Sequence, residues 1–170
     1  MVLLYQDETH VRAYQSLHAT WSQRGSQKQI PTYGHHASVT VFGTVNAQTG
    51  EVLHQTASSC KQEDFLSFLF YVLKQYKDKF VVMVTDNARI HKSKSVQNFL
   101  HEQKERLMLV YLPPYSPNLN PIERLWKWLK QQVIANRFHP TQASIKEAVQ
   151  DFFSDIAITP QAVLRRLGLH

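Results

Sequence analysis

The stretch that decides the fold is Phe80-Val81-Val82-Met83-Val84-Thr85-Asp86, an uncharged and mostly apolar run that ends on a carboxylate. Such a run predicts a strand buried on both faces, as in a parallel sheet covered by helices. Active sites of open α/β sheets form just beyond the carboxyl ends of the strands. Asp86 is therefore the first candidate for a functional residue.

A second acid stands in the same position after another run. Residues 2–6 are mostly apolar and end at Asp7. If the two strands are neighbours, Asp7 and Asp86 meet at one edge of the sheet. Each aspartate alone also fits an ordinary residue where a strand enters a loop. The matched pair is the stronger signal.

Around these strands the sequence predicts an antiparallel start, followed by alternating strands and helices. The predicted strands are residues 2–6, 18–22, 38–45, 51–56, 80–85 and 107–112, the last also buried on both faces, and the predicted helices are 62–77, 93–101, 121–136 and 141–156. This order predicts an α/β fold, a mixed sheet with helices on both faces. Residues 1–170 fit one domain, with residues 141–170 as its C-terminal helical region.

The third acid, Glu123, opens the helix predicted at residues 121–136. With Asn120 as N-cap and Pro121 next, Glu123 occupies the capping-box position, so local structure explains it by itself. Four prolines between residues 112 and 121 stiffen the preceding segment and set the angle of the helix. In the helix, Trp126 borders the buried stripe, whereas Trp128 is expected on the exposed side.

The basic residues gather near the isolated acids. The net charge is +6, and no Asp or Glu occurs between Thr9 and Gly50. Cations beside isolated acids are typical of enzymes that bind nucleic acid, although an ordinary basic surface explains them equally well. His91 fits either a phosphate contact or a cap on the following helix. The candidate DNA-binding residues are Arg12, Arg24, Lys28, Arg89, His91, Lys92, Lys94, Arg124, Lys127 and Lys130.

The composition excludes several classes of protein. With 43% apolar and 19% charged residues, the chain has the composition of a globular protein. It has no apolar run long enough for a membrane span, and because residues 1–10 show neither a basic start nor a long apolar stretch, we expect no secretory signal. The lone Cys60 fits a reducing cytoplasm and is expected to be a small buried side chain. The nine histidines match no common zinc site.

Three segments together resemble the DDE superfamily of transposases, in particular the bacterial insertion-sequence branch related to the mariner elements. They read YQDET at residues 5–9, VTDNARIH at 84–91, and LPPYSPNLNPIERLW at 112–126. Residues 20–25 also resemble the family's second strand and turn. The 36 residues between Asp86 and Glu123 fall within the spacing of this branch. The resemblance covers nearly all of residues 2–156.

The resemblance implies an RNase H-like fold, in which a mixed five-stranded sheet brings Asp7, Asp86 and Glu123 together. It implies Mg²⁺-dependent DNA cleavage and strand transfer, with those three carboxylates as catalytic residues and ligands of two Mg²⁺ ions, for which Mn²⁺ substitutes. It also implies cut-and-paste movement of transposon ends into a TA target by a homodimer on DNA.

Two alternatives stay open. An RNase H-like structure-specific nuclease would use the same metal chemistry on another substrate. The second is an inactive or regulatory fragment that binds DNA or dimerises without cleaving. Family members normally carry helix-turn-helix modules before the catalytic domain, whereas this sequence starts at the first catalytic strand. We therefore expect the recognition modules to reside in a separate upstream half, if the chain acts in transposition.

Overall fold

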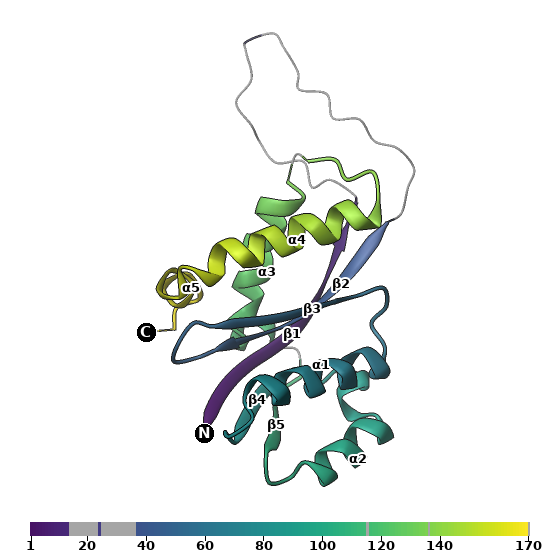
Figure 1. Ribbon diagram of the computed structural model, residues 1–170, viewed down its shortest axis with the longest axis vertical. Helices are drawn as coiled ribbons and strands as arrows, with labels where there is room; N and C mark the ends of the chain where they lie inside the picture. Colours follow the sequence, from purple (N-terminus) through teal and green to yellow (C-terminus); the bar gives the residue numbers. More distant parts are fainter. Residues whose placement is uncertain (14–23, 25–36, 115, 136, 170) are drawn as a thin grey trace.

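The computed structural model describes residues 1–13, 24, 37–114, 116–135 and 137–169. The predicted strand at residues 18–22 and the candidate Lys28 lie outside the described residues. The centre of the molecule is one five-stranded sheet with the strand order β3-β2-β1-β4-β5 (Figure 1). The strands are β1 (Val2–Arg12), β2 (Ser38–Asn46), β3 (Val52–Ala57), β4 (Val81–Thr85) and β5 (Leu107–Tyr111).

Strand β1 joins an antiparallel half of the sheet to a parallel half. It pairs antiparallel with β2, which in turn pairs antiparallel with β3. On its other side β1 pairs parallel with β4, and β4 pairs parallel with β5. The predicted mixed sheet is therefore confirmed.

The predicted end of the first strand at Gln6 is wrong. The parallel pairing with β4 stops at Tyr5, opposite Val84, but β1 continues to Arg12 because β2 supplies backbone partners along its whole length. Asp7 thus lies inside β1, opposite Gly43 of β2. Asp7 therefore does not follow the end of its own strand. It lies beside the end of the neighbouring strand β4.

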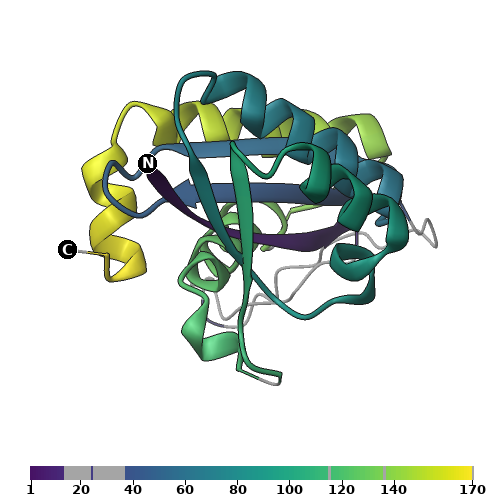
Figure 2. The same ribbon diagram turned by 90° about the horizontal axis from the view of Figure 1, so that it is seen from below.

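Helices cover both faces of the sheet, as predicted (Figures 1 and 2). Helices α1 (Gln62–Gln75) and α2 (Lys94–Glu102) pack on one face, where Phe65, Phe68 and Met83 are buried together. Helices α3 (Ile122–Val133), α4 (Gln142–Ala157) and α5 (Pro160–Leu167) pack on the other. Short 3-10 turns, η1 (Arg89–Lys92) and η2 (Pro117–Leu119), follow β4 and precede α3.

Local signals set several of these boundaries. The Ser93 hydroxyl accepts a hydrogen bond from Val96 N and so begins α2. The Asn46 side chain accepts from the backbone N–H groups of Gln48 and Thr49 in the turn between β2 and β3. Gly50 closes that turn with a φ of 75°, a left-handed conformation that favours glycine.

Strand β5 departs from its prediction. The sequence predicts a strand buried on both faces, but Met108 and Val110 are 51% and 41% exposed. β5 is the edge strand of the sheet. Helices α3 and α4 contact β1, β2 and β3, which form the opposite half of the strand order, so they do not cover the outer side chains of β5. Among the described residues, no helix is long and apolar enough to cross a membrane.

Candidate active site

The three predicted acids line one cavity of about 560 Å³. Asp7 comes from the middle of β1, Asp86 follows β4, and Glu123 lies in the first turn of α3. The remaining lining residues are Asn87, Ala88, Lys92, Leu112, Pro113, Pro114, Ser116 and Asn120. Carboxylates from three separate parts of the chain thus share one cavity, with the proline segment as one of its walls.

Asp7 is buried against α3, and it is only 8% exposed. The Trp126 indole donates a hydrogen bond from Nε1 to Asp7 Oδ2 at 2.9 Å. Burial, followed by the charges of Glu8 and Glu123, raises the pKa of Asp7 to about 7, although the hydrogen bond from Trp126 opposes that rise. The negative charge on this side of the cavity is therefore largely uncompensated.

Glu123 is positioned by a tie between α3 and the central strand. The Asn120 side chain donates from Nδ2 to the Gln6 carbonyl at 2.9 Å, which fixes the start of the helix on β1. Pro121 is the N-cap residue, with no side-chain cap hydrogen bond, and Asn120 Oδ1 has no partner among the described residues. The capping-box interpretation of Glu123 is therefore wrong. Helix capping does not account for an acid at this position, which lines the cavity.

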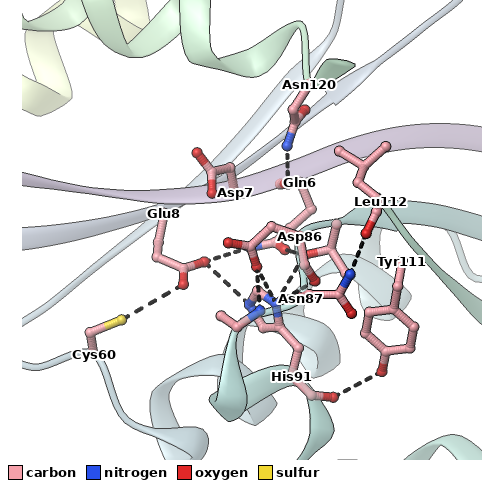
Figure 3. Close-up of polar contacts among 12 residues, drawn as sticks. Gln6, Asp7, Glu8, Cys60, Asp86, Asn87, His91, Tyr111, Leu112 and Asn120 are labelled. Atoms are coloured by element: carbon pink, nitrogen blue, oxygen red, sulfur yellow. Dashed lines mark hydrogen bonds and ion pairs between the residues drawn. The ribbon is translucent and has the colours of Figure 1, made fainter. Parts of the chain in front are cut away.

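Asp86 is held from the other face of the sheet. Its Oδ1 accepts from Ala88 N at 2.9 Å and lies 2.9 Å from His91 Nδ1. His91 is fully buried, and its Nε2 lies 3.3 Å from Glu8 Oε2. The ring packs on Phe65 with the centroids 4.3 Å apart. Figure 3 shows His91 between the two carboxylates, with Asp7 and Glu8 on opposite sides of β1.

These contacts make His91 a buried cation. Burial by itself lowers the pKa of His91, but its hydrogen bonds to the Asp86 and Glu8 carboxylates, together with their charges, more than offset burial and raise the pKa to about 9. The hydrogen bond from His91 in turn lowers the pKa of Asp86, against a smaller effect of burial. The buried ring has no surface for a DNA phosphate, and Ser93, not His91, caps α2. Both sequence interpretations of His91 are therefore wrong for this structure.

The other candidate DNA-binding residues differ in position. Lys92 is exposed and lines the cavity. Arg124 is engaged elsewhere, because its Nη1 donates to the Leu167 carbonyl at the end of α5. Lys130 is half-buried. The remaining described candidates are exposed and do not line the cavity: Arg12, Arg24, Arg89, Lys94 and Lys127.

Sequence reasoning missed several residues that shape the site. Glu8 is an acid directly beside Asp7, which is the signal that could have found it, since alternation along a strand sends it to the opposite face. Asn87 donates to the Leu112 carbonyl and so attaches the proline segment to the loop after β4.

The expected exposure of Trp128 is wrong, because its ring packs on Phe152 under Arg166. Cys60 is half-buried, not fully buried.

The residues present fit a hard divalent cation by their chemistry. Oxygen ligands are what Mg²⁺ prefers, and three carboxylates surround the cavity. Burial, followed by the charges of Glu8 and Glu123, raises the pKa of Asp7, so a cation bound beside it would favour its ionised form. No three His, Cys, Asp or Glu side chains within the described part of the chain already form a metal-binding group.

The family of this chain follows from a family model that matches most of its length, and the fold agrees with it. The mixed sheet with helices on both faces is the RNase H-like fold of the Mos1 transposase catalytic domain. The family described as DDE superfamily endonuclease matches residues 2–146. The chain belongs to this family.

Relatives and solved structures agree with that assignment. The chain is 28% identical to an uncharacterized 39 kDa protein of insertion element IS630 from Shigella sonnei, over 93% of this chain and 46% of that protein. It is 39% identical to the Tc3 transposase of Caenorhabditis elegans over 49% of this chain and 25% of that protein. The chain thus spans less than half the length of these curated relatives.

The structural neighbours share the fold at low sequence identity. The Mos1 transposase in a paired-end complex with the left transposon end matches 98% of this chain and 51% of its own, with 14% identity and a TM-score of 0.74. The Mos1 catalytic domain bound to raltegravir with Mg matches 98% and 80%, with 12% identity and a TM-score of 0.62.

Proposed function

We propose that this chain is the catalytic domain of a transposase that cleaves DNA strands and transfers them to a target in a metal-dependent reaction. The observation that supports the proposal is the convergence of Asp7, Asp86 and Glu123 on one cavity. The residues that would hold the metal are these three carboxylates, with Mg²⁺ as the ion, Mn²⁺ as its substitute and two ions per site. Bound ions of this kind supply activation of the attacking oxygen and stabilisation of the leaving oxygen.

The chain's own residues would bind and orient the DNA. Lys92, exposed at the cavity, is suited to hold the phosphate that reacts. Exposed cations outside the cavity, among them Lys94 and Lys127, would contact the DNA backbone, which gives affinity without sequence information. The wall of prolines, tied to the loop after β4 by Asn87, would keep Glu123 in place while DNA binds.

The partners belong to the same proposal. The Mos1 paired-end complex contains the left transposon end, and transposition requires two element ends to be held together. We therefore infer transposon ends and a TA target as the DNA substrates, and a homodimer as the active form. Helix-turn-helix modules from a longer protein or a separate upstream half would supply end recognition, and the reaction would take place in a bacterial cytoplasm.

The test is cleavage and strand transfer on duplex DNA with Mg²⁺ or Mn²⁺, comparing the chain with its Asp86→Asn variant. We expect the variant to lose more than about 100-fold in rate, since even partners of metal ligands are worth 10–100-fold. Asp151→Asn, the same change on the exposed side of α4, is the matched control and should keep full activity. Full activity of Asp86→Asn would overturn the proposal.

Two other outcomes point to the remaining functions. Binding of Mn²⁺, measured by electron paramagnetic resonance, without cleavage of any DNA would assign the chain as a regulatory fragment. Cleavage of RNA–DNA hybrids or branched DNA, with no strand transfer, would assign it as a structure-specific nuclease.

A further inference from the structure

The indole N–H of Trp126, the only polar group of this side chain, is hydrogen-bonded to Asp7. The indole is only 2% exposed, and it packs in the apolar cluster under β1 and β2 with Ile122 and Leu125. Its Nε1 donates to Asp7 Oδ2 at 2.9 Å, and Asp7 is itself buried. A buried indole N–H needs an acceptor, and here the acceptor is a carboxylate that lines the cavity, so the hydrogen bond links the apolar core to the site.

Gly43 makes this contact sterically feasible. It lies on β2 directly opposite Asp7 in the antiparallel register. A Cβ at this position would come within 2.5 Å of Trp126 Cη2. Gly43 is not among the glycines with a positive φ, so its backbone conformation does not require glycine. Space for the indole is the reason that a side chain at position 43 is excluded.

Helix α3 therefore holds two of the acids at once. Glu123 lies in its first turn and lines the cavity, and Trp126 follows three residues later, close to one turn further along. Asn120, just before the helix, is bonded to the Gln6 carbonyl next to Asp7. A displacement of α3 would move Glu123 and release Asp7 together.

We propose that Trp126, seated against Gly43, is a positioning residue that fixes the Asp7 carboxylate through Oδ2 and so sets its orientation as a metal ligand. This inference rests on the proposed function, because it assumes that Asp7 binds the cation. Trp126 is buried and does not line the cavity. It acts through Asp7 alone.

The first experiment measures Mn²⁺ binding by electron paramagnetic resonance. Trp126→Phe keeps an aromatic ring and removes the donor, and we expect Mn²⁺ affinity to fall about tenfold, the lower end of the range for partners of metal ligands. Trp128→Phe, which alters a ring packed on Phe152, is the control and should bind Mn²⁺ as the unchanged chain does. Gly43→Ala should weaken binding as Trp126→Phe does. Unchanged affinity in folded Trp126→Phe would overturn the inference.

The second experiment does not depend on metal. The indole N–H proton of Trp126, assigned by its loss in Trp126→Phe, is followed by NMR in the metal-free chain. Asp7→Asn should shift this resonance and leave that of Trp128 in place, because it replaces a carboxylate acceptor by a neutral amide. No shift would overturn the contact itself. A shift without any Mn²⁺ binding would leave the contact intact and contradict the proposed metal-dependent function.

Discussion

Asp7 and Asp86 line the same cavity, but the protein holds them from opposite faces of the sheet and with donors of different charge. A neutral indole from α3 holds Asp7. A buried histidine from η1, itself paired with Glu8, holds Asp86. The pKa of Asp7 is raised to about 7, first by burial, whereas the hydrogen bond from His91 lowers the pKa of Asp86.

The opposite pKa shifts of the two aspartates show how far a hydrogen bond can offset the effect of burial on a carboxylate. A neutral donor beside Asp7 does not compensate for burial and for two neighbouring glutamates. A cationic donor beside Asp86 does, because His91 adds an opposite charge to its hydrogen bond and because the Asp86 side chain, 50% exposed, loses less hydration. The Asp7 side of the cavity is therefore where a bound cation would relieve the most unfavourable charge.

The largest effect is expected from removing the buried cation. His91→Leu keeps an apolar side chain against Phe65 but leaves Glu8 without its charged partner, at a side-chain exposure of 12%. Breaking a buried charged pair costs about 3 kcal/mol or more in the free energy of unfolding, measured by urea denaturation at pH 7. His101→Gln, on the exposed end of α2, is the control. A loss below about 1 kcal/mol would mean that the pair contributes little.

The same variant has a defined pH dependence. The pKa of His91 is raised to about 9, so the stability gained from its charge is complete below about pH 6.5 and is lost as the pH rises through 9. The stability difference between the unchanged chain and His91→Leu should therefore shrink between pH 7 and pH 10. Adding Glu8→Gln to His91→Leu should recover part of the loss at pH 7, because the unpaired buried charge is removed.

The two aspartates should respond to amidation with opposite signs in the metal-free chain. Since the pKa of Asp7 is raised to about 7, its ionised form destabilises the fold at pH 8, and Asp7→Asn should stabilise it by on the order of 2 kcal/mol. That gain should disappear below about pH 4, where Asp7 is protonated in both the folded and unfolded states. Thermal unfolding from pH 4 to pH 8 measures it, and a destabilised Asp7→Asn would contradict the comparison.

Asp86→Asn should destabilise the fold at pH 8. The pKa of Asp86 is lowered, so its stabilising contribution is present above its unfolded value and is lost as the pH falls through the folded one. Because the side chain is 50% exposed, the cost should be only about 1 kcal/mol. The same melting series tests it, and an equal stabilisation of both amide variants would remove the distinction between the two sites.

The smallest effect is expected at Cys60. Its Sγ lies 3.9 Å from Glu8 Oε1, on the far side of Glu8 from His91. Burial, together with the nearby carboxylates, raises the pKa of this thiol to about 11, so it stays protonated. Cys60→Ser should change the free energy of unfolding by no more than about 0.5 kcal/mol, because His91 and not the thiol compensates Glu8. A larger loss would mean that the thiol also stabilises Glu8.

Local sequence patterns predicted most of the described strands and helices, but not the end of β1 or the exposure of β5. The apolar run before Asp86 and the helical spacing in α1 predict buried elements, because they reflect the periods of strand and helix. The end of β1 and the exposed face of β5 could not be predicted in this way. Both depend on which neighbour lies alongside, and that is a property of the sheet, not of the strand.

The sequence by itself determined the order of strands and helices, the mixed sheet and the matched pair of Asp7 and Asp86, since apolar periodicity is a property of the chain. Glu123 was identified through the resemblance to the DDE superfamily, because local structure alone also explains an acid at that position. Only the tertiary structure decided how each acid is held. The Trp126 indole reaches Asp7 across 119 positions of sequence, and His91 is enclosed between Glu8 and Asp86. Such partners are invisible in a pattern of spacing, because burial and charge become specific only when strands and helices pack together.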